Sequence, residues 1–199
     1  MDVEFVFDPK ATVASLLLIA RAVRPDKYTA CKLLFLADRL HLVRYGRTIT
    51  GSAYYALPHG PVPSQALDML NYVIEGRPLN SEWLREIEGR FGVEESQYPS
   101  LIPKLQPDLE QLSTSDAETI NETVSRYGTA SDFGELYNLT HAMPAYRLAI
   151  ERGGASKNPR ILYEDFFKDN PDVVAGAFEE MIENWEIRLQ HQTVACGER

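Results

Sequence analysis

The segment from Tyr28 to Tyr45 constrains the fold more than any other part of the sequence, because apolar side chains occupy nearly the whole circumference of a helix there. A helix at a protein surface keeps a polar face, whereas this pattern requires neighbours on almost every side. We therefore predict a buried central helix around which the rest of the chain packs. Gly46 follows directly, and glycine tolerates the left-handed conformation that ends many helices. The apolar positions are Ala30, Leu33, Leu34, Phe35, Leu36, Ala37, Leu40, Leu42 and Val43.

Apolar residues recur at helical spacing along most of the chain, so the predicted fold class is mainly α, a compact multi-helix domain. The predicted helices span residues 10–24, 28–45, 64–75, 115–127, 131–139, 144–152 and 172–190, with a short helix that Ser81 caps. Residues 47–57 carry β-branched and aromatic side chains, which predict a short two-stranded hairpin or an extended excursion. The run HGPVPS, from His59 to Ser64, predicts a rigid turn before the next helix.

The second half of the sequence contains segments with weaker or different signals. Residues 91–111 include three prolines and no clear periodicity, which predicts a connecting segment over the core. Ser115 to Glu118 match a capping box, in which the serine oxygen and the glutamate satisfy opposite backbone N–H groups. We expect one domain over residues 10–152, followed by an acidic, amphipathic helical extension over residues 153–199 that packs on it.

Charge and cysteine content limit the classes of function. The net charge of −9 argues against nucleic-acid binding as the main task, because phosphate neutralisation needs clustered lysine and arginine. The first 78 residues are mildly basic and the remainder is acidic. This asymmetry indicates either ordinary solvated surface or two faces of opposite sign that meet different partners. The two cysteines, Cys31 and Cys196, provide neither a disulfide framework nor a metal knuckle.

The sequence predicts a cytoplasmic protein that does not contact a membrane. Its longest apolar stretch, Val13 to Ala20, is flanked by Lys10 and Arg21 and falls short of the roughly 18 to 20 residues that cross a bilayer. The N-terminal segment carries acidic residues where a secretory signal has a basic region.

Motifs for catalysis or metal binding are not apparent, so we expect no metal and no cofactor. The histidines are scattered, without HxxxH, HExxH or CxxC spacing, at His41, His59, His141 and His191. The most suggestive arrangement is Asp38, His41 and Tyr45, which share one face of the predicted central helix and suit a general-base relay. The alternative, which we favour, is a set of polar groups in a buried helix that are each satisfied by hydrogen bonds.

Two long motifs resemble the signature of a known family. KLLFLADRLHLVRYG (Lys32 to Gly46), followed by TGSAYYALPHGPVPS (Thr50 to Ser64), is similar to the Panacea domain of SocA-like antitoxins. Two later segments of the chain, LSTSDAETINETVSRYG from Leu112 and ELYNLTHAMPAYRLAI from Glu135, resemble later elements of that domain. Tyr146 stands where tryptophan is usual in the family. The resemblance covers roughly residues 10–152.

The resemblance implies a helical domain that neutralises a cognate toxin by direct binding and that is not an enzyme. Two alternatives are also binding functions: an adaptor that delivers a bound protein to a cytoplasmic protease, and a phage counter-defence protein. An uncharacterised enzyme that uses Asp38, His41 and Tyr45 is the alternative from another class. The motif residues expected to have structural roles are Gly46, Gly51, Gly60, Pro61, Pro63, His141 and Pro144.

Two surfaces are candidates for contact with a protein partner. The first, which we expect to be the main contact, comprises Arg39, Arg44, Arg47, Tyr54 and His59. Its arginines suit a carboxylate or phosphate, or alternatively they stabilise the negative end of a helix dipole. The second is the acidic face of the last helix, with Glu179, Glu180, Glu183 and Glu186, which suits a toxin with a basic active site. Alternatively, Tyr54 and Tyr55 pack the hairpin onto the core and Trp185 docks the last helix.

Overall fold

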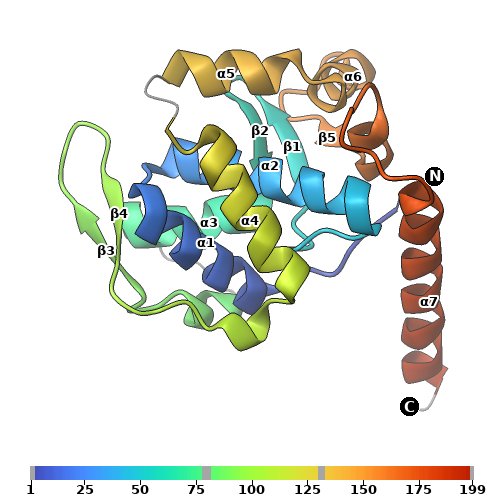
Figure 1. Ribbon diagram of the computed structural model, residues 1–199, viewed down its shortest axis with the longest axis horizontal. Helices are drawn as coiled ribbons and strands as arrows, with labels where there is room; N and C mark the ends of the chain where they lie inside the picture. Colours follow the sequence, from blue (N-terminus) through green and yellow to red (C-terminus); the bar gives the residue numbers. More distant parts are fainter. Residues whose placement is uncertain (1–2, 78–81, 130–132, 198–199) are drawn as a thin grey trace.

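Helix α2 (Lys27–Tyr45) runs through the centre of the protein, with other elements packed around it (Figure 1). The computed structural model describes residues 3–77, 82–129 and 133–197. Every side chain from Ala30 to Val43 is buried except that of Arg39. Gly46 ends the helix in the left-handed conformation, with φ 64°, and its N–H donates to the carbonyl oxygen of Leu42. The predicted buried central helix is confirmed.

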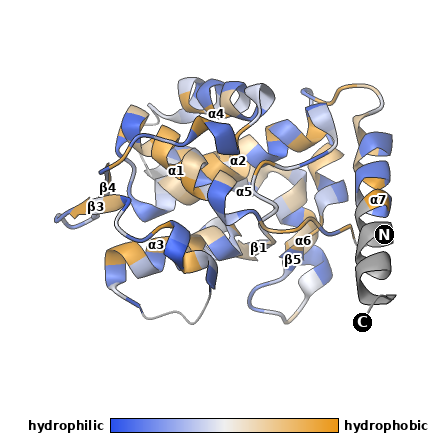
Figure 2. Ribbon diagram, turned by 90° about the horizontal axis from the view of Figure 1, so that it is seen from below, coloured by the Kyte–Doolittle hydropathy of each residue, from blue (hydrophilic) through white to orange (hydrophobic). Residues whose placement is uncertain are grey.

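A first apolar core lies where α1 (Pro9–Val23), α3 (Ser64–Glu75) and α4 (Thr114–Tyr127) pack against α2 and against one another. Figure 2 shows apolar residues of α1 and α2 in the interior and polar residues on the outer side of α4. The predicted helices over residues 10–24, 64–75 and 115–127 are therefore confirmed. Fully buried members of this core include Leu16, Leu33, Leu70 and Ile120.

A second apolar core lies around the C-terminal half of α2 and a small antiparallel sheet. The sheet contains β1 (Tyr54–Leu57), β2 (Gly60–Pro63) and β5 (Arg160–Ile161) in the order β2-β1-β5. Phe35 of α2 makes edge-on ring contacts with Tyr54 and Phe166, each at a centroid distance of 5.4 Å. The helices confirm the predicted fold class, because the strands form only small additions to them.

The GPVP sequence forms strand β2, so its prediction as a turn is wrong. The segment over residues 47–57, predicted as a short hairpin or an extended excursion, contains a loop up to Tyr54 and then strand β1. Ser64 N–H donates to the carbonyl oxygen of Ala53 at 2.8 Å, and this bond sets the phase of the ladder. Along an antiparallel pair of strands, residue pairs that exchange backbone hydrogen bonds alternate with pairs that do not. Pro61 and Pro63 therefore lie in pairs that do not exchange hydrogen bonds with β1, so their missing N–H groups break no bond. Prolines are tolerated there because β2 is an edge strand.

The segment over residues 91–111 contains a second hairpin that the sequence analysis described only as a connection. Strands β3 (Phe91–Glu94) and β4 (Ser100–Pro103) pair antiparallel and project from the body (Figure 1). The hairpin is attached where Leu101 N–H donates to the carbonyl oxygen of Pro25 at 2.9 Å. Short helical turns η1 (Glu82–Glu86) and η2 (Leu109–Gln111) flank it. The expected cap at Ser81 lies outside the described residues.

The start of α4 is capped by a different pair from the one predicted. Ser113 is the N-cap, and its hydroxyl and backbone N–H form reciprocal hydrogen bonds with Asp116. The predicted box from Ser115 to Glu118 is therefore wrong by two residues, because the Ser115 hydroxyl instead contacts His41. Helices α5 (Phe133–Ala142) and α6 (Pro144–Gly153) follow, as the predicted helices over 131–139 and 144–152 indicated.

The C-terminal segment adds β5, the helical turn η3 (Tyr163–Phe167) and helix α7 (Ala177–Gly197). The predicted start of the last helix at residue 172 is wrong, because residues 171–176 form turns and Val174 N–H bonds to the carbonyl oxygen of Val43 in α2. Figure 1 shows α7 at the edge of the molecule opposite the β3–β4 hairpin. No helix in the described ranges combines the length and apolar character needed to cross a membrane.

Asp38 connects α2 to the loop that precedes β1. Its carboxylate accepts hydrogen bonds from Ile49 N–H (2.8 Å), Thr50 N–H (3.1 Å) and the Tyr54 hydroxyl (2.5 Å), and also from the Thr50 hydroxyl. Burial raises the pKa of Asp38 above its usual value, and these four hydrogen bonds oppose that effect. The carboxylate thus satisfies two backbone donors that would otherwise be buried without an acceptor.

We predict that Asp38→Ala lowers the free energy of unfolding by at least about 3 kcal/mol, because it leaves several buried donors without an acceptor. Tyr54→Phe removes one donor and keeps the carboxylate, so its expected cost is about 1 to 2 kcal/mol. Urea unfolding followed by circular dichroism measures both. Equal losses for the two variants would contradict the central role of Asp38.

Candidate functional site

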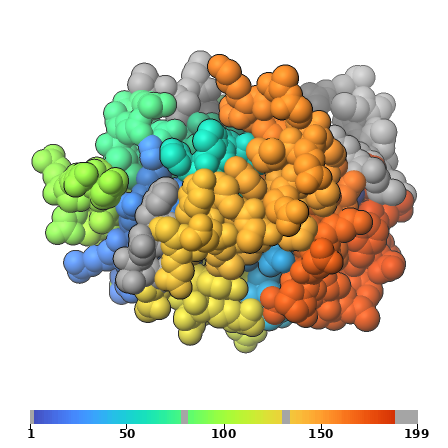
Figure 3. All heavy atoms as spheres, turned by 90° about the horizontal axis from the view of Figure 1, so that it is seen from above, coloured from blue at the N-terminus to red at the C-terminus, as the bar shows by residue number. Residues whose placement is uncertain are grey.

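Three polar side chains from three different helices hold the turn of the β1–β2 hairpin. Each bonds to a backbone carbonyl oxygen in or beside the turn, and the three helices are α2, α5 and α6. The bonds join Lys32 Nζ to Pro61 (2.7 Å), His141 Nε2 to Pro58 (3.2 Å) and the Tyr146 hydroxyl to Leu57 (2.9 Å). Because these helices are packed in the core, the turn is fixed relative to the body of the protein. Figure 3 shows the hairpin segment, cyan to teal, at the surface beside α5 in gold.

A pocket of about 310 Å³ adjoins this turn. Its walls come from the first turns of α2, from the hairpin and from α3, and the side chains of Leu57, Val62 and Leu67 make it largely apolar. Pro58, His59 and Tyr98 also line it and are exposed to solvent. Tyr98, between β3 and β4, is 66% exposed, which is unusual for so large an aromatic residue. The hairpin turn and this pocket together form the candidate site, which we call the turn site.

Lys32 is the fully buried charged residue of the turn site, and it was not among the contact residues predicted from the sequence. The residue is 0% exposed, and its ammonium lies 4.8 Å from the centroid of the Tyr28 ring. Burial lowers the pKa of Lys32 to about 8. Among the described residues it has no carboxylate partner, and Pro61 accepts its one hydrogen bond. A lysine inside an otherwise apolar and fully buried helical stretch was the sequence signal that marked this position.

The candidate arginines lie at the other end of α2, so the structure divides the first predicted surface into two parts. Arg44 follows Lys32 by twelve positions, about 18 Å along the helix. Arg44 forms a two-pronged pair with Glu122 of α4, and Arg47 bonds to Asp116 at 2.8 Å. Arg39 is half-buried, and burial lowers its pKa. Arg44 and Arg47 therefore act mainly to connect the end of α2 and the residues after it with α4.

Asp38, His41 and Tyr45 do not form the relay that their spacing suggested. Asp38 faces the loop before β1, whereas His41 bonds through Nδ1 to the carbonyl oxygen of Arg47 (2.8 Å) and through Nε2 to Asp116 (3.0 Å). The Tyr45 ring only packs on the imidazole, at a centroid distance of 4.6 Å. Asp38 and His41 thus make separate structural hydrogen bonds, and Tyr45 contributes a ring contact. Within the described ranges, no cluster of three or more His, Cys, Asp or Glu residues is suited to a metal ion.

The remaining predicted contact residues differ in their access to solvent. Tyr54 is 1% exposed and bonds to Asp38, so it does not reach the surface in this conformation. His59 is exposed at the hairpin turn. Glu179 and Glu183 are exposed on one face of α7. Of the predicted contact residues, His59 and the two glutamates are therefore the ones exposed to solvent.

The motif residues with expected structural roles lie at close contacts between elements. A Cβ added to Gly46 would lie 2.7 Å from the backbone nitrogen of Met181, so this glycine permits α7 to approach the end of α2. A Cβ at Gly51 would overlap the carbonyl oxygen of Val6. Pro144 occupies the first turn of α6, where its missing N–H has no helical partner to lose.

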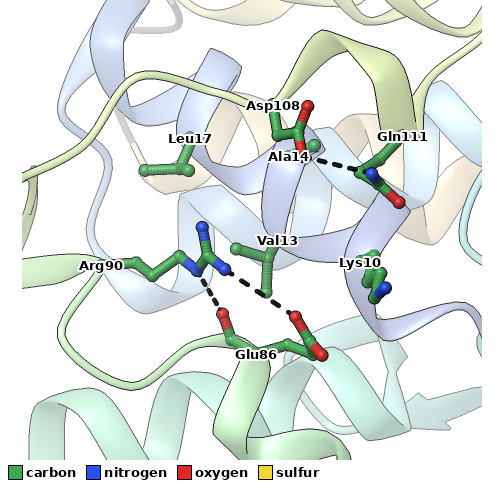
Figure 4. Close-up of a pocket in the computed structure, with 8 residues that line it drawn as sticks. All are labelled: Lys10, Val13, Ala14, Leu17, Glu86, Arg90, Asp108 and Gln111. Carbon is green, nitrogen blue, oxygen red and sulfur yellow. Dashed lines mark hydrogen bonds and ion pairs between the residues drawn. The ribbon is translucent and has the colours of Figure 1, made fainter.

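A second pocket, of about 140 Å³, lies between α1, η1 and η2 (Figure 4). Two pairs of its polar groups bond to each other: Arg90 pairs with Glu86, and the amide of Gln111 donates to Asp108 at 3.1 Å. Its floor is formed by apolar residues of α1. Because Arg90 and Glu86 compensate each other's charge, we take the turn site as the candidate site instead.

The fold and the turn site define a mainly helical module with a small, fixed hairpin at its surface. The family model of the Panacea domain of SocA-like antitoxins matches residues 31–145, which is more than half of the chain. This chain therefore belongs to that family. The matched range includes Lys32 and His141, and Tyr146 lies one residue beyond it. Searches of curated proteins and of solved structures returned no match to this chain.

Replacement of Gly60 tests how closely the turn packs against Lys32 and His141. Gly60 has φ 98°, and an added Cβ would lie 2.8 Å from Lys32 Nζ and 3.0 Å from His141 Cε1. Gly76 also has a positive φ, of 62°, but a Cβ there meets nothing within 4 Å. We predict that Gly60→Ala lowers the free energy of unfolding by at least about 1 kcal/mol more than Gly76→Ala. Equal melting curves for the two variants would contradict the close packing.

Asp116 is expected to make stability dependent on acidic pH. Burial raises its pKa, but hydrogen bonds from His41 and Ser113 and the charge of Arg47 outweigh that effect and lower the pKa to about 2. Because the folded-state pKa lies below the unfolded value, the stabilisation is present above about pH 4 and is lost as the pH falls towards 2. Wild type should lose about 2 kcal/mol more than Asp116→Asn over this range, measured by urea unfolding. Identical acid dependence would refute the assignment.

Proposed function

We infer that this protein neutralises a cognate toxin by binding it directly. Membership of the SocA-like antitoxin family is the observation that carries this proposal. The geometry agrees with it, because Asp38 and His41, two of the three residues that resembled a catalytic relay, are engaged in structural hydrogen bonds. A binding function instead requires a preformed surface, and the turn site provides one.

The turn site is the proposed main contact with the toxin. Its hairpin turn is held by three side chains, so little conformational freedom is lost when a partner binds. Exposed Pro58, His59 and Tyr98 surround an apolar pocket, and exposed aromatic residues beside a pocket are typical of interface centres. The arginines at the far end of α2 are not part of this contact, since carboxylates of the same protein already bind two of them.

The acidic face of α7 is the proposed second contact. Glu179, Glu183 and Glu186 are exposed, and their spacing of four and three residues places them on one side of the helix. Between Ala177 and Ile187 the helix has no lysine or arginine. A toxin that acts on RNA or nucleotides needs a basic active site, which this face would attract over long distances.

The direct test is co-expression with the toxic reading frame encoded beside this gene. We predict growth arrest from the neighbouring protein alone, growth rescue when this chain is present, and a stable complex in size-exclusion chromatography. Growth arrest by this chain alone, or rescue without a complex, would contradict direct neutralisation. A shorter toxin half-life that depends on a protease would instead identify the adaptor function.

Charge reversal separates the two proposed contacts. We predict that Glu179→Lys with Glu183→Lys slows toxin association about 10-fold at low salt and has a smaller effect at high salt, because exposed charges act through steering. His59→Asp at the turn site should chiefly accelerate dissociation. Surface plasmon resonance measures both rates, and Glu110→Lys with Glu118→Lys, at two exposed positions outside α7, is the control with the same change of net charge. If the control weakens binding equally, net charge rather than the α7 face is responsible.

A further inference from the structure

The pocket of the turn site has apolar walls, and Lys32, whose side chain is fully buried, lies among its lining residues. A buried charge is costly unless an opposite charge or several hydrogen bonds compensate it. Here the described residues offer one carbonyl oxygen and the face of the Tyr28 ring. The other charged residues of the pocket are engaged locally: Asp26 caps α2 by accepting from Thr29 N–H at 2.7 Å, and Lys27 pairs with Glu75. Of the two lysines that line the pocket, Lys32 is thus the one without a carboxylate partner among the described residues.

We propose that this pocket receives the C-terminal residue of the toxin, with an apolar side chain against the walls and the free carboxylate directed towards Lys32. The inference rests on the proposed neutralising function and names the chemistry of its contact. A C-terminal residue is the part of a polypeptide that offers an apolar side chain and a carboxylate on the same carbon atom. A C-terminal residue can also enter a closed pocket directly, because no further residues follow it and need an exit.

The dimensions and electrostatics of the pocket fit this occupant. A volume of about 310 Å³ lies at the lower end of pockets that enclose small ligands, so one or two residues fill it. Lys32 is shielded from water, so its attraction for an anion is weakly screened compared with that of a surface lysine. The exposed ring of Tyr98 and the turn residue His59 line the pocket where the preceding residues of such a peptide would lie.

The test uses N-acetyl-glycyl-leucine with a free carboxylate and the same compound as a carboxamide, titrated into the full-length protein. Protein-observed NMR reports both the affinity and the residues affected. The free acid is expected to bind about 10-fold more tightly than the amide and to shift the signals of Val62 and Leu67. Equal affinity for acid and amide, or no shifts at these residues, would overturn the proposal.

Lys32→Met keeps a long side chain and removes the charge, and it should abolish the preference for the acid. Lys27→Met is the matched control, since Lys27 lines the same pocket but pairs with Glu75, and this variant should keep the preference. If Lys32→Met does not fold, wild-type protein titrated at about pH 7 and about pH 9.5 provides the same comparison, because Lys32 loses its proton over this range. Cys31 stays a neutral thiol there, since burial raises its pKa to about 12. An acid preference that survives loss of the Lys32 charge would refute the role of this residue.

The proposal and the proposed function fail in different ways. Growth rescue by the Lys32→Met variant at wild-type level, together with a stable complex, would overturn the pocket contact and leave direct neutralisation intact. Selective binding of the free acid without any rescue of a neighbouring toxin would support the pocket chemistry and contradict the antitoxin function. A short polar extension fused to the C-terminus of the toxin gives the final comparison, since it moves the free carboxylate away from the pocket and should weaken binding to wild type more than to Lys32→Met.

Discussion

The burial of polar groups inside α2 determines how the other segments pack. A helix enclosed on all sides must satisfy each polar side chain within the protein, because water does not reach it. Lys32, Asp38 and His41 find partners in three different segments: the β1–β2 hairpin, the loop before β1 and the start of α4. Apolar contacts alone would allow several relative positions of the neighbouring segments. Each of these hydrogen bonds forms only when donor and acceptor lie in one relative position. The central helix therefore specifies the positions of its neighbours as well as providing the core.

The need to satisfy buried polar groups also explains the positions of the family motif residues. It explains as well why these residues do not identify the partner. Lys32, His141 and Tyr146 use their polar atoms on the hairpin backbone, and Gly60 leaves room for the first two. These residues shape the turn without being its exposed surface. Recognition then falls to side chains at the rim, such as His59 and Tyr98, which the packing of the core does not constrain. One scaffold can thus present different surfaces to different toxins.

Segments outside the matched range complete the core of this chain. α1 supplies Leu16 to the first apolar core, while Phe166 and Met181 belong to the second. The Tyr163 hydroxyl bonds to the carbonyl oxygen of Ser52 at 2.6 Å, and β5 pairs with β1. α7 has two roles in consequence: its inner face packs beside Gly46, and its outer face carries the exposed glutamates. A deletion that begins before η3 would damage folding and binding together.

The sequence by itself determined the helices and the family, because helical periodicity, glycine stops and a long contiguous motif are local signals. It placed α2 and α3 to within about one residue, and it marked Gly46 and Gly60 as structural positions. Tertiary structure decided the attachment of the β3–β4 hairpin and the late start of α7, since each depends on a bond to a distant residue, and it directed the Ser115 hydroxyl to His41. It also separated Arg44 from His59, buried Tyr54 and brought Lys32 to a pocket. Spacing along a chain shows which residues share an element, but only packing shows which of their groups remain free for a partner.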